Sequence, residues 1–223
     1  MGELVGVPRY GVAMPNSATR IHLFRHGQVT QAWQGMIYGR LDVPLSETGL
    51  EQARWAASSL EDVALGAVIS SGLQRAETSA AQLRQGRDLP RRDEPDLLEI
   101  DRGSWAGLSP QQVNRNNPGG FEAWKASGGL LTPPGGETVQ VMAMRVSTCL
   151  LSLAEEYAGS TIAIVAHMWV LRIALCMGLS RPWQDTPRMQ VGPGVRTDFE
   201  WTPGVGLRFL GVEAPEGSEV KLG

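Results

Sequence analysis

The residues best suited to chemistry in this chain stand at the end of its first apolar run. Residues 21–24 are followed directly by Arg25, His26 and Gly27. A neutral imidazole is a competent nucleophile near pH 7, because the unperturbed pKa of histidine is about 6.5. The neighbouring guanidinium would attract an anion, and the glycine would let that anion approach the backbone. The three residues predict attack by His26 on an anionic ligand.

Two later strands are predicted to end in residues of the same kind. Residues 66–70 lead into Arg75 in the first turn of a helix, and residues 161–166 lead into His167 at the start of another helix. Ligands collect at the carboxyl ends of parallel strands, so these side chains are expected to converge at one edge of the sheet. Helix N-termini would add N–H donors and partial positive charge there. The sequence therefore predicts a cationic pocket of phosphate size.

Segments typical of strands and helices alternate along the chain. We expect strands over residues 20–25, 66–70, 91–93, 161–166, 196–201 and 207–212, and helices over residues 46–60, 73–85, from 109, 138–157 and 168–177. Ser46 is the expected N-cap of the first helix, whose inner stripe would be Leu50, Ala53, Ala57 and Leu60. Residues 95–108 fit neither type, and long loops in compact domains are often functional. The alternation predicts an α/β fold: a single three-layer domain with a mostly parallel central sheet and helices on both faces.

Composition restricts the class of protein. The 223 residues suffice for one domain, expected at residues 20–213 between an N-terminal arm (1–19) and a polar C-terminal tail (214–223). Hydrophobic residues at 42% and charged residues at 19% are typical of a soluble globular protein. The net charge of −3 gives no general attraction for nucleic acid, and the arginine-rich segment 84–92 is expected to be a solvated edge. No apolar run approaches the about 20 residues that a membrane span needs.

Cysteine usage indicates the compartment. Cys149 and Cys176 are the only cysteines, and each lies in an apolar stretch that is predicted to be helical. Two buried thiols are the main interpretation and a disulfide is the alternative. No signal peptide is visible in the first twenty residues, so a cytoplasmic location is expected. The sequence leaves the oligomeric state open, with a homodimer as one option.

Several further segments, in a fixed order, make a specific pattern. They are Leu23-Phe24-Arg25-His26-Gly27-Gln28, Tyr38-Gly39-Arg40, Pro44-Leu45-Ser46-Glu47-Thr48-Gly49, Ser70-Ser71 with Arg75-Ala76-Glu77-Thr78, Leu98-Glu99-Ile100, Gly103-Ser104-Trp105-Ala106-Gly107-Leu108, Gly135-Gly136-Glu137-Thr138 and Val165-Ala166-His167. With these segments the chain resembles the histidine phosphatase superfamily, also called the phosphoglycerate mutase-like family. Because the segments span most of the chain in the order of that family, accidental resemblance is improbable.

The resemblance implies a role for five residues. His26 would be the nucleophile that forms a phosphohistidine, and Glu99 would donate a proton to the leaving group. Arg25, Arg75 and His167 would bind the phosphoryl oxygens, with a protonated His167 as a further donor. No metal and no cofactor is required. The implied partner is a small phosphomonoester substrate, with contacts assigned at the pocket mouth to Gly27, Gln28, Thr30, Tyr38, Gly39, Arg40 and Met168.

The chain departs from the family pattern near the pocket mouth. The run after the first glycine is Gln28-Val29-Thr30, no asparagine follows a few residues later, and His167 is followed by Met168 and Trp169 where glycine is usual. Acidic residues often stand at the positions of Gly72 and Ala106. Trp105 and Trp169 would be core residues or an apolar substrate wall. The departures leave the five core residues intact, so they bear on the substrate and not on the chemistry.

These residues are expected to act as a phosphomonoester hydrolase. One alternative is a mutase of the phosphoglycerate type, which shares the site but returns the phosphoryl group to a second position. Such mutases resemble longer chains with an inserted segment over the pocket, which this chain lacks. A second alternative is a silent module that binds phosphorylated ligands without catalysis, and the intact set of candidate residues argues against it.

Overall fold

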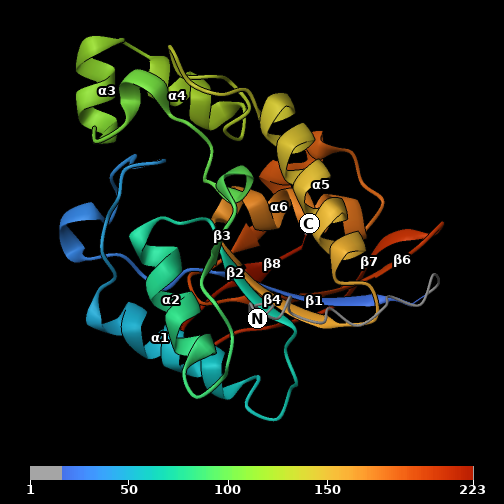
Figure 1. The fold of residues 1–223 in the computed structure, drawn as a ribbon. Helices are drawn as coiled ribbons and strands as arrows, with labels where there is room; N and C mark the ends of the chain where they lie inside the picture. Colours follow the sequence, from blue (N-terminus) through green and yellow to red (C-terminus); the bar gives the residue numbers. More distant parts are fainter. Residues whose placement is uncertain (1–16, 223) are drawn as a thin grey trace, which may run out of the picture.

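A six-stranded mixed sheet lies at the centre of the computed structural model, which describes residues 17–222 (Figure 1). The strands lie side by side in the order β3-β2-β4-β1-β6-β7. Their bounds are β1 Thr19–Arg25, β2 Ala67–Ser70, β3 Arg92–Asp93, β4 Thr161–Ala166, β6 Arg196–Thr202 and β7 Gly206–Glu213. The first four strands pair in parallel, while β6 and β7 are antiparallel to their neighbours. The predicted mostly parallel sheet is confirmed.

Helices cover both faces of this sheet, as expected for three layers. One face packs against α1 (Glu47–Ser58) and α2 (Gln74–Arg84), and the opposite face against α5 (Val139–Glu156) and α6 (Met168–Gly178) (Figure 1). The side chains of β4 after its first residue are all buried, which is why this strand reads as a continuous apolar run.

The first helix begins as predicted but shows a different face to the core. The Ser46 hydroxyl accepts a hydrogen bond from the Gly49 N–H at 3.1 Å, so Ser46 is the N-cap. Ala53 and Leu60 are buried, whereas Leu50 and Ala57 are only half-buried, and Gly49 and Ala56 take their places. The reason is the docking of Gly49 against the backbone of residues 27–28, which sets the rotation of α1.

Smaller elements complete the described chain. Residues 95–108, which the sequence left unassigned, contain the 3₁₀ turns η2 (Pro95–Leu97) and η3 (Gly103–Trp105). They lead to α3 (Pro110–Asn116), which has a full capping box at Ser109, and to α4 (Gly120–Ala126), which the sequence did not predict. Two further 3₁₀ turns are η1 (Gln31–Trp33) and η4 (Trp183–Arg188). In Figure 1, α3 and α4 lie together beyond the end of the sheet.

The two ends of the chain were expected to be an arm and a tail. Residues 1–16 of the expected N-terminal arm, and residue 223, lie outside the described residues. Within residues 214–222, β8 (Val220–Lys221) pairs antiparallel with β5 (Gln190–Val191). This short ribbon ties the C-terminal residues to the segment that leads into β6.

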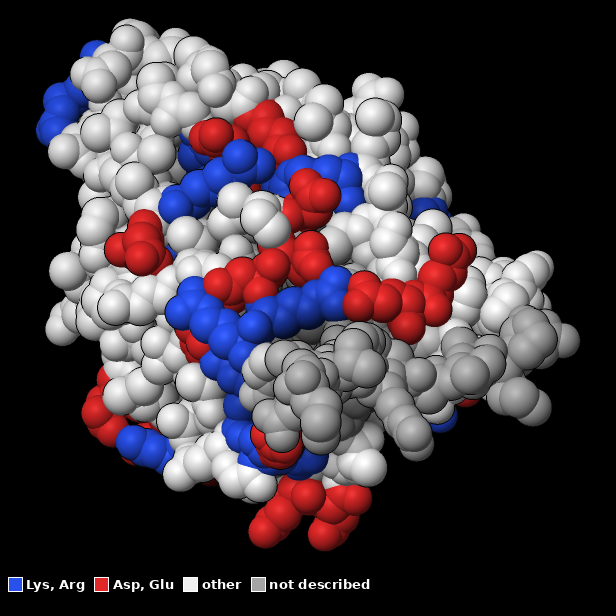
Figure 2. Space-filling model, in the orientation of Figure 1, with Lys and Arg blue, Asp and Glu red and all other residues white. Residues whose placement is uncertain are grey.

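Charged side chains of both signs are interleaved on the face shown in Figure 2. Arg84 and Arg91 pair with Glu77 and Asp93, while Arg92 binds Glu156 at 2.5 Å. Arg87, the fourth arginine of residues 84–92, donates to the backbone carbonyls of Val63 and Leu60. Arg91 is exposed, as expected for a solvated edge, whereas the side chain of Arg84 is mostly buried. In residues 17–222, no helix is both long and apolar enough to span a membrane.

Both cysteines are buried thiols, as predicted. Cys149 lies in α5 and Cys176 in α6, and neither is in a disulfide. Burial raises the pKa of Cys149 to about 12 and that of Cys176 to about 11. Both thiols are therefore protonated at neutral pH.

Gly27 and Gly49 allow two backbone segments to touch. A Cβ on Gly27 would collide with the carbonyl oxygen of Gly49, and a Cβ on Gly49 with that of Gln28. The sequence analysis explained the small size of Gly27 by the need of an anionic ligand to approach the backbone. The structure adds a second reason, which is close contact between the loop after β1 and the first turn of α1.

Replacing Gly49 with alanine should destabilise the protein by about 1–3 kcal/mol, because the added methyl group must displace backbone. Urea denaturation would measure the loss as a lower transition midpoint. Gly211→Ala is the matched control, since its Cβ would meet no atom within 4 Å and its φ is not positive. If Gly49→Ala matched the wild type in stability, the contact would not be tight in solution.

Candidate active site

The register of two central strands brings two histidines together. Arg25 of β1 lies opposite Ala166 of β4, and the His26 N–H donates to the Ala166 carbonyl at 3.0 Å. The residues that follow the two strands, His26 and His167, therefore emerge side by side. Their ring centroids are 5.2 Å apart with the planes at 60°. The sequence prediction of convergence is met by these two rings.

One hydrogen bond determines which nitrogen of His26 carries the free lone pair. Its Nδ1 lies 2.7 Å from the carbonyl oxygen of Gly27. A carbonyl only accepts hydrogen bonds, so Nδ1 carries the proton and the lone pair is on Nε2. The residue is 2% exposed. Burial first, and then the charges of Arg75 and Arg25, hold the pKa of His26 well below its usual value. His26 is thus a neutral ring with Nε2 available.

His167 is the second histidine of the pair. It is fully buried at the N-cap of α6, and its Nε2 is 2.7 Å from the Ser71 hydroxyl. Its Nδ1 is buried without a partner among the described residues. Burial, followed by the charges of Arg75, His26 and Arg25, lowers its pKa well below the usual value. The groups around His167 therefore favour its neutral form, and the protonated His167 that the family resemblance implies stays a prediction.

Two arginines complete the cationic cluster. Arg75, in the first turn of α2, is completely buried and donates to the carbonyl oxygens of Gly39 and Leu41, both at 2.7 Å. Arg25 donates from Nη1 to the Val191 carbonyl at 2.5 Å. The Nε of each guanidinium is buried and has no partner within residues 17–222. Buried donors are rarely left unsatisfied, so these groups fit an anion that is bound between them.

Glu99 follows η2 and is 8% exposed. Its Oε1 accepts a hydrogen bond from the Ile100 N–H at 2.9 Å. It lines a cavity of about 170 Å³ together with Arg25, Met36, Ile37, Tyr38, Gly39, Arg102, Trp124 and Met168. Arg25 and Tyr38 also line a neighbouring cavity of about 220 Å³ that contains His26, Gly27 and Gln28. Arg25 and Tyr38 therefore form a wall common to both cavities, with His26 in the lining of one and Glu99 in the lining of the other.

A group of ionised side chains fixes the backbone beside Glu99. The Glu99 carbonyl accepts hydrogen bonds from Arg40 Nε at 3.0 Å and from Arg145 Nη2 at 3.3 Å. Glu137 binds both arginines, at 3.1 Å and 2.7 Å. Burial raises the pKa of Glu137, but the hydrogen bond and charge of Arg145 and the charge of Arg40 lower it overall. Glu137 is therefore a positioning residue for the loop that carries Glu99.

Not every predicted substrate contact reaches a cavity. Gly27, Gln28, Tyr38, Gly39 and Met168 line one or both cavities. Thr30 and Arg40 line neither. The Thr30 N–H donates to the Pro44 carbonyl at the start of η1, and Arg40 is held by Glu137 as described above.

The aromatic wall comes from a residue that the sequence reasoning missed. Trp105 and Trp169, the two tryptophans beside motif residues, are 6% and 1% exposed and belong to the core. Trp124 of α4 lines the smaller cavity instead, next to Arg102. Arg102 stands three residues after Glu99. This short spacing was the one signal in the sequence that Arg102 could lie in the same cavity as Glu99. Ser71 belongs to the Ser70-Ser71 segment of the family pattern, but its contact with His167 was not predicted.

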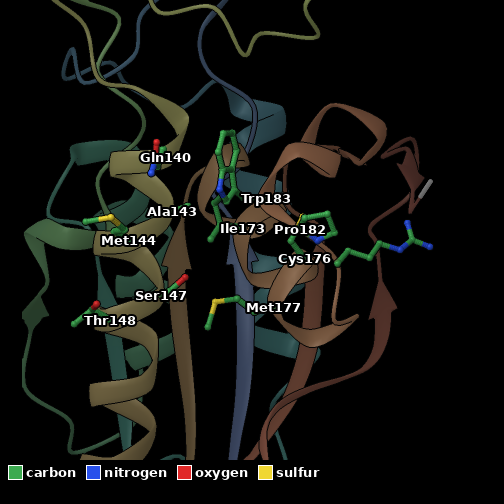
Figure 3. A pocket seen from close by; sticks show the side chains of 11 residues that line it. Gln140, Ala143, Met144, Ser147, Thr148, Ile173, Cys176, Met177, Pro182 and Trp183 are labelled. Atoms are coloured by element: carbon green, nitrogen blue, oxygen red, sulfur yellow. The ribbon is translucent and has the colours of Figure 1, made fainter.

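A larger cavity of about 600 Å³ lies between α5 and the α6–η4 region (Figure 3). Its lining includes Met144, Ile173, Met177 and Trp183. The possible nucleophiles in the lining are the hydroxyls of Ser147 and Thr148 and the thiol of Cys176, which is protonated at neutral pH. None of the candidate catalytic residues lines it. The candidate catalytic residues therefore lie at the edge of the sheet and not in this groove.

Comparison with known proteins agrees with the arrangement of the residues. Residues 21–208 match the sequence profile of the histidine phosphatase superfamily (branch 1). The chain belongs to the histidine phosphatase superfamily. It is 28% identical over 168 residues, 74% of this chain and 80% of the relative, to phosphoserine phosphatase 1 of Hydrogenobacter thermophilus. It is 27% identical over 200 residues, 87% and 98% of the two chains, to adenosylcobalamin/alpha-ribazole phosphatase of Escherichia coli.

Solved histidine phosphatases share the fold. A putative alpha-ribazole-5'-P phosphatase from Escherichia coli superposes with a TM-score of 0.78 at 25% identity, covering 88% of this chain and 96% of the other. A mycobacterial glucosyl-3-phosphoglycerate phosphatase gives 0.76 at 28% identity, covering 88% and 98%. This histidine phosphatase therefore has relatives that are named for different phosphorylated substrates.

The ring pKa values of this histidine phosphatase can be tested directly, because the chain has only three histidines. In nuclear magnetic resonance titrations, two rings should have midpoints below 6.5, since burial and the arginines disfavour the imidazolium of His26 and His167. Saturation with orthovanadate should raise the His167 midpoint, because the anion offsets the arginine charges. The His22→Gln variant assigns the third ring. Midpoints of 6.5 or above for both rings in the free protein would contradict the proposed electrostatics.

Proposed function

We propose that this histidine phosphatase hydrolyses small phosphomonoesters through a phosphohistidine formed on Nε2 of His26. The observation that carries the proposal is the hydrogen bond from Nδ1 to the Gly27 carbonyl, which leaves Nε2 as the free lone pair of a buried, neutral ring. The family membership and the phosphatase names of its relatives support the reaction type.

The phosphoryl group would be bound by the donors that lack partners. These are the Nε atoms of Arg25 and Arg75 and the Nδ1 of His167. Two permanent positive charges offset the repulsion between the nucleophile and a phosphate dianion, and they stabilise charge on the equatorial oxygens. A bound dianion would also favour the imidazolium of His167, which would then donate from both ring nitrogens.

The first step is an in-line displacement. The lone pair of His26 Nε2 attacks phosphorus as the bond from phosphorus to the leaving oxygen breaks, and protonated Glu99 gives its proton to that oxygen. The phosphorylated ring is cationic, and its Nδ1–H remains bonded to the Gly27 carbonyl. Water then attacks phosphorus, Glu99 takes a proton from the water, and the P–N bond breaks. Inorganic phosphate leaves and His26 regains its lone pair.

The finer assignments follow from this scheme. We assign the partner as a small-molecule phosphomonoester, propose that the protein acts in the cytoplasm, and leave a homodimer as one option for its assembly. The scheme needs no metal, because the guanidinium groups supply the positive charge at the phosphoryl oxygens. Activity with p-nitrophenyl phosphate should therefore persist in the presence of a chelator.

The experiment that tests the function separates hydrolysis from transfer. The protein is incubated with p-nitrophenyl phosphate and, separately, with 2- and 3-phosphoglycerate, and both inorganic phosphate and the position of the phosphoryl group are followed. A hydrolase releases phosphate in step with substrate consumption. Interconversion of the phosphoglycerates without net phosphate release would indicate the mutase, and binding without either reaction would indicate a silent module.

A further inference from the structure

Arg102 is a buried cation without an acidic partner. It is 7% exposed, its Nη1 is buried without a hydrogen-bond partner, and no hydrogen bond or ion pair joins its side chain to any residue in 17–222. Burial lowers the pKa of Arg102, although the charge of Glu99 raises it. A buried charge is costly unless something compensates it, and no carboxylate within residues 17–222 forms an ion pair with this guanidinium.

Aromatic rings hold the Arg102 guanidinium in place. It lies 5.1 Å from the ring centroid of Trp124 and 5.4 Å from that of Trp169. A second cation, Arg172, lies 5.0 Å from the Trp169 ring, and its Nε is also buried without a partner. Burial lowers the pKa of Arg172 to about 10. Two guanidinium groups therefore flank one tryptophan, and Glu99 is the carboxylate whose charge acts on both.

The cavity beside Arg102 is where the leaving group would lie. In an in-line displacement the leaving oxygen is opposite the attacking Nε2 of His26. Glu99, the proposed proton donor to that oxygen, shares its cavity of about 170 Å³ with Arg102 and Trp124. That cavity adjoins the one that contains His26, because Arg25 and Tyr38 line both. A leaving group that receives a proton from Glu99 is thus in reach of Arg102.

We propose that Arg102 binds a second anionic group, a carboxylate or a second phosphate, on the leaving group of the substrate. The inference rests on the proposed function and names the class of substrate for that site. A guanidinium that is already oriented by two aromatic rings presents its fork of N–H donors at little cost in entropy. The small cavity favours a short leaving group, in which the anion is a few bonds from the ester oxygen. Arg172, the second cation over the Trp169 ring, adds positive charge to the same region.

The test uses three substrates with the same three-carbon skeleton. Glycerol 1-phosphate has a neutral leaving group, 3-phosphoglycerate adds a carboxylate, and glycerol 1,3-bisphosphate adds a phosphate. We expect the wild type to favour at least one anionic substrate about 10- to 100-fold in kcat/KM, the range of a hydrogen-bonded pair of charged groups. The two anionic arms distinguish carboxylate from phosphate. Arg102→Gln should bring the preference close to one, and Arg102→Lys should keep part of it.

The ratio of two kcat/KM values within one sample does not depend on the amount of folded enzyme, so partial unfolding of a variant leaves the readout valid. Arg208→Gln, an exposed arginine paired with Glu200, is the matched control and should keep the wild-type ratio. A wild type without anion preference would overturn the inference. An anion preference that Arg102→Gln leaves unchanged would also overturn the inference. Equal losses of kcat/KM on all three substrates would overturn it too, because they would indicate that Arg102 only holds Trp124 in position. Failure of the wild type to release phosphate from these esters and from p-nitrophenyl phosphate would instead overturn the proposed function.

Discussion

Replacing His26 with alanine is expected to lower kcat for phosphomonoester hydrolysis at least about 10⁴-fold, because the scheme has no other nucleophile for phosphorus. The same change should abolish covalent labelling. Wild-type enzyme mixed with ³²P-labelled substrate and quenched in alkali should carry phosphate on the peptide that contains His26, since phosphohistidine survives base and hydrolyses in acid. Mass spectrometry of the alkaline digest would locate the phosphoryl group.

His22→Gln is the matched control for this experiment. His22 lies in β1, four residues before His26, and its Nδ1 is 2.7 Å from an Asp198 carboxylate oxygen. The control should keep both labelling and turnover, even if its stability falls with the loss of that buried pair. Labelling that persists in His26→Ala would remove His26 as the nucleophile, and labelling lost in both variants would point to a folding defect.

Much of this fold was predictable because its signals are local. The apolar run that becomes β4 has no polar position after its first residue, and Ser46 and Ser109 mark helix starts with side chains that do cap them. The meeting of His26 and His167 was predictable for the same reason. β1 and β4 are parallel neighbours whose last residues lie opposite each other, so the residue that follows each strand emerges at the same edge of the sheet.

Other features depend on contacts between distant segments, and the sequence does not show them. Helix α4 has a glycine N-cap at φ 75° without a side-chain cap, so no start signal identifies it. Because α4 was missed, its Trp124 was missed as the partner of Arg102. The lowered pKa of His167 also depends on burial and on the charges of Arg75 in α2 and Arg25 in β1, which spacing alone does not give. Arg40 was expected near substrate, but Glu137, far away in sequence, holds it against the Glu99 carbonyl.

Glu99→Gln should slow hydrolysis of alkyl phosphates about 10²- to 10⁴-fold, the usual contribution of a general acid or base. An alkoxide leaves poorly without a proton, whereas p-nitrophenolate leaves readily without one. The loss in the first step should therefore be much smaller for p-nitrophenyl phosphate. The second step is the same for every substrate and also uses Glu99, as the base for water.

These two roles predict a particular kinetic form. With p-nitrophenyl phosphate, the Glu99→Gln variant should release a burst of p-nitrophenolate equal to the enzyme concentration and then turn over slowly, while phosphohistidine accumulates. With an alkyl phosphate no burst should occur, because the first step is already slow. Asp96→Asn is the matched control, since Asp96 is an exposed carboxylate close in sequence that lines neither cavity. Equal losses on both substrates without an accumulated intermediate would assign Glu99 to the structure of its loop. A loss of the same size in Asp96→Asn would show that neither carboxylate acts by proton transfer at the ester oxygen.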